Sequence, residues 1–194
     1  MPPARLSHES IAPAVRFVGH AIVSADGIIS DADGGMPAAL RNQADWRHFQ
    51  AALDASALVV LGRLGHERHR NPGRPRLVLT GASTGLAADP DDPRAQLYNP
   101  AVLPLAAALA EFGIAEGTIA VTGGTRVFDA FLPLYDAFDL AEVNGLALPG
   151  GRPCFAGGHP RAVLAGAGLR PERYELIDAA AGVSLTRWVR GKAS

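Results

Sequence analysis

Short apolar runs alternate along the chain with segments in which apolar residues recur at helical spacing. The apolar runs are bounded by glycine, proline or polar residues and predict strands at residues 16–23, 57–61, 76–80, 118–122 and 138–143. Helical spacing predicts helices at residues 41–53, at residues 101–112 and from near Thr125 onward. Near the C-terminus, two further apolar runs at 173–177 and 183–189 flank Gly182 and predict an antiparallel hairpin.

This order of elements predicts an α/β fold. Strands that alternate with helices favour a mostly parallel central sheet, with the C-terminal hairpin antiparallel at one edge. A chain of 194 residues, of which 48% are hydrophobic, is long enough for one domain over 1–194, with 1–15 as an N-terminal extension. Residues 89–93, Asp-Pro-Asp-Asp-Pro, are expected to form a surface loop.

Composition narrows the classes of function. Eighteen lysines and arginines nearly balance 19 aspartates and glutamates, so no strong field favours nucleic acid or an anionic membrane. No apolar stretch suggests a signal peptide or a membrane span, and the single cysteine, Cys154, excludes an internal disulfide and fits a reducing compartment. We therefore expect a cytoplasmic protein that acts on a small molecule, with a homodimer through the C-terminal hairpin and Trp188 as one arrangement.

Two strand ends carry glycine next to arginine. Gly123, Gly124, Thr125 and Arg126 follow the strand at 118–122 and open a helix, while Gly62 and Arg63 follow the strand at 57–61. Glycine lets the backbone approach a ligand, a helix start offers free N–H groups, and arginine binds phosphate. Because ligands bind beyond the carboxyl ends of parallel strands, the two sites together predict a dinucleotide cradle. Ordinary turns with solvated arginines are the alternative, and no Gly-x-Gly-x-x-Gly fingerprint supports a Rossmann domain.

Asp45 is the candidate for proton chemistry. It precedes Phe49 by four residues and so shares the apolar face of its helix, where burial would raise the pKa of its carboxyl group. Such a group can bind a protonatable nitrogen heterocycle or assist proton delivery near neutral pH. A helix N-terminal acid that complements the dipole, or pairs with Arg41, is the alternative.

Three other signals are weaker. Residues 81–85 fit Gly-x-Ser-x-Gly, but the residues after them start a helix poorly, which argues against a hydrolase. His66 and His69 have the spacing of a metal pair without further ligands, and His20 is expected to pack against the sheet. No metal site is predicted.

An ordered series of motifs from Val18 to Val143 resembles the dihydrofolate reductase family. The motifs are Gly35-Met-Pro37, Asp45-Trp-Arg-His-Phe49, Val59-Val-Leu-Gly-Arg63 with Glu67, Pro72-Gly-Arg74, Leu77-Val-Leu-Thr80, Val121-Thr-Gly-Gly-Thr-Arg-Val-Phe128, Phe131-Leu-Pro133 and Leu140-Ala-Glu-Val143. The resemblance implies the three-layer fold of that family and hydride transfer from NADPH to a carbon–nitrogen double bond of a dihydropterin, either dihydrofolate or dihydromethanopterin.

The resemblance also implies roles for individual residues. Asp45 would hold the pterin nitrogens, Ile22 and Phe49 would line the substrate pocket, and Arg74 would grip the carboxylate of a folate tail. Residues 24–36 match the mobile loop that closes over the nicotinamide. The cofactor-binding residues would be Gly62, Arg63, Gly65, Thr80, Gly123, Gly124, Thr125 and Arg126, with a cis peptide bond between the two adjacent glycines.

Departures from the family pattern leave alternatives open. Ala38 replaces a usual tryptophan, Ala141 replaces the threonine that orients the key acid, and Leu64 and Gly81 replace polar groups near the 2′-phosphate. Residues 24–27, Ser-Ala-Asp-Gly, also resemble the riboflavin-pathway pyrimidine reductases, which share the fold. An aminouracil reductase is therefore the first alternative, and a non-catalytic NADPH-binding module is the second.

Overall fold

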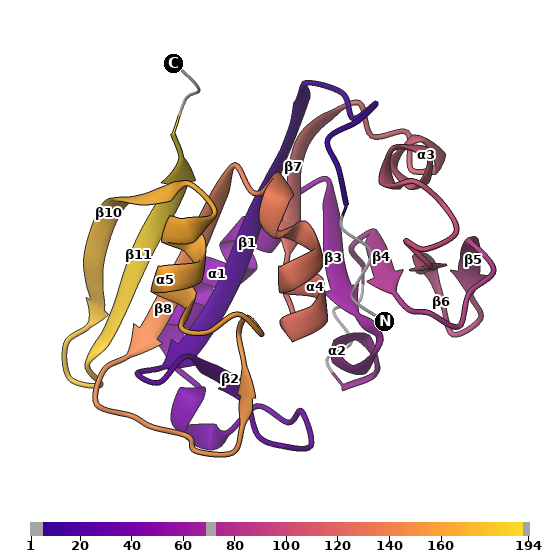
Figure 1. The fold of residues 1–194 in the computed structure, drawn as a ribbon. Coiled ribbons are helices and arrows are strands. Elements are labelled where there is room, and N and C mark those ends of the chain that lie inside the picture. The colour runs from indigo at the N-terminus through magenta and orange to yellow at the C-terminus, as the bar shows by residue number, and fades with distance from the viewer. Residues whose placement is uncertain (1–5, 69–72, 192–194) are drawn as a thin grey trace.

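A nine-stranded sheet forms the centre of the computed structural model, which describes residues 6–68 and 73–191 (Figure 1). The strand order is β10-β11-β8-β1-β7-β3-β4-β6-β5. Strands β8, β1, β7, β3, β4 and β6 run parallel to one another, whereas β5 pairs antiparallel with β6, β11 with β8, and β10 with β11. The strands are β1 (Ala14–Ser24), β3 (Leu58–Gly62), β4 (Arg76–Leu79), β5 (Leu86–Asp89), β6 (Asp92–Tyr98), β7 (Glu116–Val121), β8 (Ala137–Val143), β10 (Leu169–Asp178) and β11 (Val183–Arg190).

Helices cover both faces of this sheet and make three layers. On one face, α3 (Leu105–Glu111), α4 (Thr125–Phe131) and α5 (Pro160–Gly166) contribute to the main core, in which Phe17, Phe128 and Phe138 are buried. On the other face, Leu53 of α1 (Gln43–Asp54) packs against Val59 and Ala120. The predicted mostly parallel α/β sheet with an antiparallel C-terminal hairpin is confirmed.

Local sequence explains where α1 begins. The side-chain oxygen of Asn42 accepts hydrogen bonds from the backbone N–H groups of Ala44 at 2.9 Å and Asp45 at 3.1 Å, which satisfies two of the donors left free at a helix start. The Asn42 amide donates to Asp178 at 2.8 Å, which joins the helix start to the end of β10. The cap therefore fixes where the first turn of α1, with Asp45, lies relative to the sheet.

The smaller elements were harder to predict. A second sheet pairs β2 (Ile28–Ser30) with β9 (Arg152–Pro153), α2 (Arg63–Arg68) directly follows β3, and the 3-10 turns η1 (Ala38–Leu40) and η2 (Leu132–Leu134) complete the fold. Residues 86–98, a region with no predicted strand, form the β5–β6 hairpin. The expected surface loop at 89–93 is therefore wrong in part, because only its centre turns between two paired strands.

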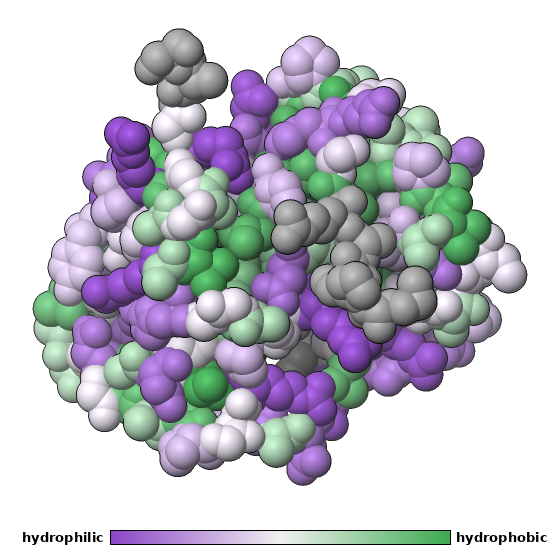
Figure 2. All heavy atoms as spheres, in the orientation of Figure 1, coloured by the Kyte–Doolittle hydropathy of each residue, from purple (hydrophilic) through white to green (hydrophobic). Residues whose placement is uncertain are grey.

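The surface carries hydrophilic and hydrophobic residues side by side, and neither kind alone covers the face seen in Figure 2. Trp188 is only 6% exposed and belongs to the main core, so its ring is not available to a dimer interface; the homodimer stays a prediction. Within residues 6–68 and 73–191, no helix combines the length and apolar character needed to cross a membrane.

Candidate functional site

A cavity of about 1190 Å³ opens at the carboxyl ends of the parallel strands β1, β3, β4 and β7. This is the edge at which open parallel sheets bind ligands. Eleven of the twelve predicted site residues line it: Ile22, Asp45, Phe49, Gly62, Arg63, Gly65, Thr80, Gly123, Gly124, Thr125 and Arg126. Segments far apart in the sequence are thus brought to one site.

The two glycine turns touch each other. The Gly62 N–H donates to the Gly123 carbonyl at 2.9 Å, and the Thr122 N–H donates to the Val60 carbonyl at 2.9 Å. These bonds extend the pairing of β3 with β7 by the last residues before each helix. The turns after β3 and β7 therefore form one continuous wall of the cavity.

In the turn after β7, the absence of a side chain has a different physical reason at Gly123 and at Gly124. Gly123 has φ +108°, and a Cβ added there would lie 2.7 Å from Cε2 of Phe128, so any side chain would be strained. A Cβ on Gly124 would meet no atom within 4 Å and would project into open space. The expected cis peptide bond between these glycines is wrong, because the bond is trans and the positive φ of Gly123 makes the turn.

Three arginines line the cavity with different partners. The exposed Arg63 is paired with Glu67 of the same helix, from Nε to Oε1 at 2.6 Å. Arg152 donates from Nε to the Ala32 carbonyl at 2.9 Å. In the described part of the chain the guanidinium group of Arg126 makes no hydrogen bond or ion pair, so it is the arginine most available to an anion.

Arg152 was missed by the sequence reasoning. It follows two glycines in a loop with no motif, and only the β2–β9 pairing brings it to the cavity. The threonines that were predicted hold loops in place: Thr125 Oγ1 donates to the Pro153 carbonyl at 2.5 Å, and Thr80 Oγ1 accepts from the Ala82 N–H at 3.2 Å.

Asp45 lies in the first turn of α1 and lines the cavity together with Ile22 and Phe49. Burial raises the pKa of its carboxyl group from 3.8 to about 6, although the nearby His48 acts in the opposite direction. Ile22 is 8% exposed, and the Phe49 ring contacts the ring of His20 with centroids 6.2 Å apart. An ionisable group with a pKa near neutrality thus stands beside an apolar surface.

Arg74 is the predicted site residue that does not line the cavity. Its guanidinium donates to Asp54 from Nε at 3.0 Å and from Nη2 at 2.5 Å, and Nη2 also reaches the Gln50 side chain at 3.0 Å. The structure therefore places Arg74 against the C-terminal end of α1.

The segment after β1 covers part of the cavity, as the resemblance implies for residues 24–36. Ile29, Ser30 and Met36 are among its lining residues. At the start of the segment, Ser24 donates from Oγ to Asp26 at 2.5 Å, and both carboxylate oxygens of Asp26 accept from the Leu148 N–H at 3.1 Å. The Ser-Ala-Asp-Gly sequence thus anchors this end of the loop to the chain beyond β8.

A cluster of His20, His48 and Asp139 on the cavity wall was not predicted as a site. Burial lowers the pKa of His20 to about 4, while the interaction with Asp139 raises the pKa of His48. Burial alone would raise the pKa of Asp139, but His48, His20 and Arg187 outweigh it and lower that pKa. The available signal was an aspartate within a mostly apolar strand, β8, all of whose residues are buried.

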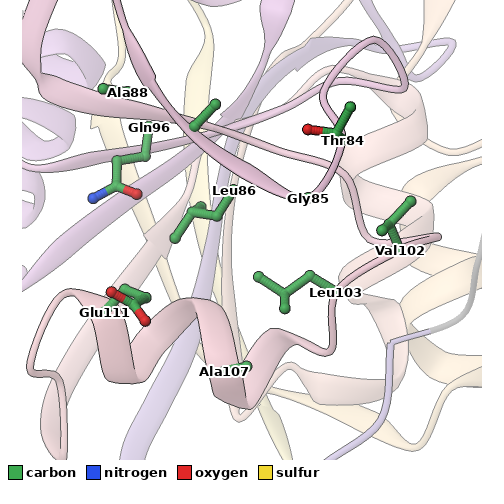
Figure 3. A pocket seen from close by; sticks show the side chains of 10 residues that line it. Thr84, Gly85, Leu86, Ala88, Gln96, Val102, Leu103, Ala107 and Glu111 are labelled. Atoms are coloured by element: carbon green, nitrogen blue, oxygen red, sulfur yellow. The ribbon is translucent and has the colours of Figure 1, made fainter.

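A smaller cavity of about 530 Å³ lies between the β5–β6 hairpin and α3 (Figure 3). Its lining, in the described part of the chain, includes Leu86, Gln96, Leu103 and Glu111 and none of the predicted site residues. Glu111 is the one titratable residue in this lining among the residues that the structure describes. The larger cavity is therefore the candidate site.

No family model matches the sequence, and no curated protein matches it. Solved structures do match. A candidate riboflavin biosynthesis protein of Shewanella sp. PV-4 aligns with a TM-score of 0.64 and 18% identity, over 91% of this chain and 99% of that chain. Dihydrofolate reductase of Enterococcus faecalis, complexed with NADP(H) and RAB-propyl, aligns with a TM-score of 0.63 and 17% identity, over 91% and 97%. The chain has the dihydrofolate reductase-like fold.

A third match is a diaminohydroxyphosphoribosylaminopyrimidine deaminase/5-amino-6-(5-phosphoribosylamino)uracil reductase of Thermotoga maritima. It has a TM-score of 0.64 and 16% identity over 92% of this chain, which spans 57% of that longer chain. At these identities the comparisons establish the dihydrofolate reductase-like fold alone, and the chemistry must be argued from the site itself.

Proposed function

We propose that this protein is an NADPH-dependent reductase that reduces a carbon–nitrogen double bond of a dihydropterin to give the tetrahydropterin. The observation that carries the proposal is the position of Asp45. Its carboxyl group, with a pKa raised to about 6 by burial, shares one cavity with two contacting glycine turns and with Arg126, whose guanidinium has no partner among the residues that the structure describes. One end of the cavity suits a phosphate-bearing cofactor, and Asp45 suits a nitrogen heterocycle.

The residues present fit NADPH. Gly124 leaves open space where a side chain would stand, Gly123 gives the turn a conformation that other residues rarely adopt, and Arg126 supplies a positive charge. Gly62, Arg63, Gly65, Thr80 and Thr125 would complete the binding residues. NADPH, when bound, would supply the hydride.

The protein's own part of the reaction is to orient and protonate. In its ionised form Asp45 would accept hydrogen bonds from the amino and ring N–H groups of a pterin, and Phe49 and Ile22 would pack against the ring. In its protonated form, populated near pH 6, Asp45 would help deliver a proton to the nitrogen of the carbon–nitrogen double bond, whose carbon would accept the hydride. Loop residues such as Ile29 and Met36 would exclude water.

A riboflavin-pathway aminouracil reductase is the second candidate, and a specific observation favours it. Arg74, the residue expected to grip a folate tail, is held by Asp54 and Gln50 outside the cavity. The Ser24–Asp26 contact also organises the loop whose sequence resembles that of the pyrimidine reductases. Within the pterins, the same placement of Arg74 favours a substrate without a glutamate tail, such as dihydromethanopterin.

The test is oxidation of NADPH by the purified protein with dihydrofolate, dihydromethanopterin and the aminouracil substrate, each as the only acceptor. We expect turnover with at least one dihydropterin and a lower kcat/KM with the aminouracil. Turnover with the aminouracil alone would replace the leading proposal by the second. Tight NADPH binding without oxidation in any reaction would identify a non-catalytic module.

A further inference from the structure

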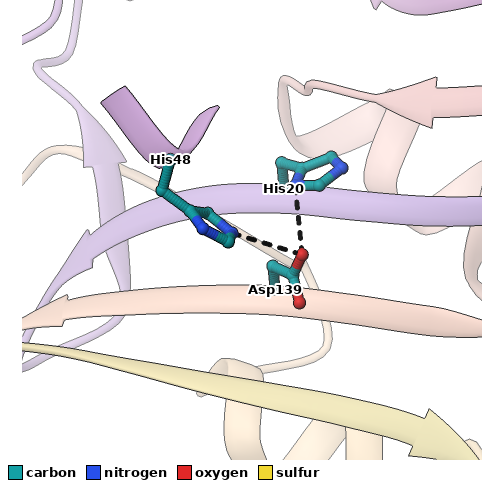
Figure 4. Close-up of side chains that lie close together, drawn as sticks. All are labelled: His20, His48 and Asp139. Carbon is teal, nitrogen blue, oxygen red and sulfur yellow. Dashed lines mark ion pairs between the residues drawn. The ribbon is translucent and has the colours of Figure 1, made fainter. Parts of the chain in front are cut away.

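Three side chains from three elements converge on the wall of the candidate cavity. His20 extends from β1, His48 from α1 and Asp139 from β8, and the contacts between them meet at Asp139 (Figure 4). Nδ1 of His20 and Nε2 of His48 each lie 3.5 Å from Oδ2 of Asp139, and the three donor atoms all lie within 4.8 Å of one another.

These separations are long for hydrogen bonds, which prefer roughly 2.7–3.2 Å between donor and acceptor. They match what a metal ion requires. With metal–nitrogen and metal–oxygen bonds of about 2.0–2.2 Å, neighbouring ligand atoms in a tetrahedral site stand roughly 3.3–3.6 Å apart. The two contacts to Asp139 therefore have the length of the edges of a coordination polyhedron.

The burial of the His20 side chain also favours a bound cation. Its side chain is 5% exposed, and its Nδ1 has no hydrogen-bond partner in the described part of the chain, although this atom faces Asp139. A buried polar atom without a partner is unfavourable, because it has lost its hydrogen bonds to water without replacement. A cation held between His20 and Asp139 would satisfy that nitrogen.

We propose that His20, His48 and Asp139 form a binding site for a divalent transition-metal ion. Two imidazoles and one carboxylate suit Zn²⁺, Co²⁺, Ni²⁺ or Fe²⁺ better than Mg²⁺ or Ca²⁺, which prefer oxygen ligands alone. Because all three residues line the cavity, an ion held by them would be accessible to water or to an oxygen or nitrogen atom of a bound substrate. The site would place a Lewis acid beside Asp45.

Charged residues next to the cluster affect how strongly it would bind a cation. Arg187 donates from Nη1 to both oxygens of Asp139, at 2.9 and 3.0 Å, and so orients the carboxylate as outer partners of metal ligands do. Its positive charge weakens cation binding, whereas the carboxylate of Asp45, one helical turn before His48, strengthens it. If Arg187 prevails, the cluster is an ion-pair network without a metal.

Metal binding does not depend on the proposed reductase activity, so the two ideas fail separately. We would remove metals from the folded protein with a chelator, then titrate it with Zn²⁺ by calorimetry and with Co²⁺ by visible absorption, in the absence of NADPH and substrate. The variants are His20→Ala and His48→Ala, and the matched control is His8→Ala, which removes an exposed histidine outside the cavity.

We expect one ion per chain in the wild type and in His8→Ala, with affinity lowered at least about tenfold in both cluster variants. Binding of equal affinity in all four proteins, or no saturable binding in the wild type, would overturn the proposal. If the buried His20→Ala variant does not fold, as judged by circular dichroism, the result for the half-exposed His48 decides.

Discussion

At the scale of a residue, Asp45 connects the fold to the proposed reaction. Its carboxyl group is placed by the Asn42 cap at the start of α1 and is largely removed from solvent, which makes the ionised form unfavourable. A carboxylate in this position is useful only if a substrate compensates for the lost water. The same group should therefore lower stability and raise activity.

The stability effect has a defined pH dependence. The pKa of Asp45 is about 6 in the folded protein against 3.8 for the free group, so the folded state binds the proton more tightly. The contribution of Asp45 to stability is full below about pH 4 and is lost as the pH rises through about 6. We expect the Asp45→Asn variant to gain on the order of 2–3 kcal/mol relative to wild type between about pH 4 and about pH 7.5. Urea unfolding at both pH values measures it, and a constant difference would contradict the assigned pKa.

The activity effect should be opposite in sign. The Asp45→Asn variant keeps the shape of the side chain but removes the charge, so we expect kcat/KM for the substrate to fall by roughly 10²-fold, with NADPH affinity within about twofold of wild type. Asp91→Asn is the matched control, because Asp91 is exposed in the turn between β5 and β6 and lies outside the cavity. Undiminished turnover by Asp45→Asn would remove the role of this residue.

The two exposed arginines of the cradle should differ in their effect on cofactor choice. Arg126 follows the glycine pair and has no other partner in the described chain, so we expect Arg126→Gln to weaken NADPH and NADH by a similar factor, roughly tenfold. Arg63 must give up its ion pair with Glu67 to bind a ligand. We expect Arg63→Gln to weaken the binding of NADPH more than the binding of NADH. Fluorescence titration gives both dissociation constants. A larger NADPH-specific loss in Arg126→Gln would reverse the assignment.

At the scale of an element, the two adjacent glycines of the turn between β7 and α4 should have different roles. We expect Gly123 to matter for stability and Gly124 to matter for NADPH binding. Gly123→Ala would force a methyl group into the Phe128 ring at a φ of +108° and should reduce the free energy of unfolding by about 1–3 kcal/mol. Gly124→Ala meets no neighbour, so stability should stay within about 0.5 kcal/mol while NADPH binds more weakly, because the methyl group enters the cradle. Thermal unfolding and NADPH titration of both variants test this, and normal NADPH affinity in Gly124→Ala would place the cofactor elsewhere.

The elements also show what sequence could predict. The strands β1, β3, β7 and β8 each contain a run of buried apolar residues, so hydrophobicity located them. The β5–β6 hairpin escaped because its residues are mostly half-exposed and its turn is rich in aspartate and proline, as in a loop. Pairing with β4 stabilises these strands, and such long-range partners leave little trace in local sequence.

At the scale of the whole molecule, the site was predictable where one segment carries several of its residues. The glycine turns and the first turn of α1 are local motifs, and eleven predicted residues line one cavity. The His20, His48 and Asp139 cluster draws one residue from each of three elements, and Arg152 reaches the cavity only through the β2–β9 pairing. Spacing along the chain cannot show convergence of this kind; topology does.

Arg74 shows how the whole fold decides a substrate. Its guanidinium joins the start of β4 to the end of α1 through Asp54 and Gln50, and it does not line the cavity. If a glutamate tail is not gripped, dihydrofolate and a dihydropterin without that tail should be reduced with kcat/KM values within about threefold of each other. We expect Arg74→Ala to leave that ratio unchanged and to lower stability by up to about 1 kcal/mol, because its partner Asp54 is 69% exposed.

If Arg74 does bind the tail of dihydrofolate, its replacement should change KM for that substrate rather than the stability of the protein. If Arg74→Ala raises KM for dihydrofolate by roughly tenfold or more and leaves the tail-less substrate unaffected, then Arg74 leaves Asp54 to bind the tail carboxylate, as the family resemblance implies. Asp54→Asn then serves as the partner variant. Weakening the Arg74–Asp54 pair should lower KM for dihydrofolate if the arginine is released to the tail, and should have no effect on KM if the arginine serves only to fasten α1 to the sheet.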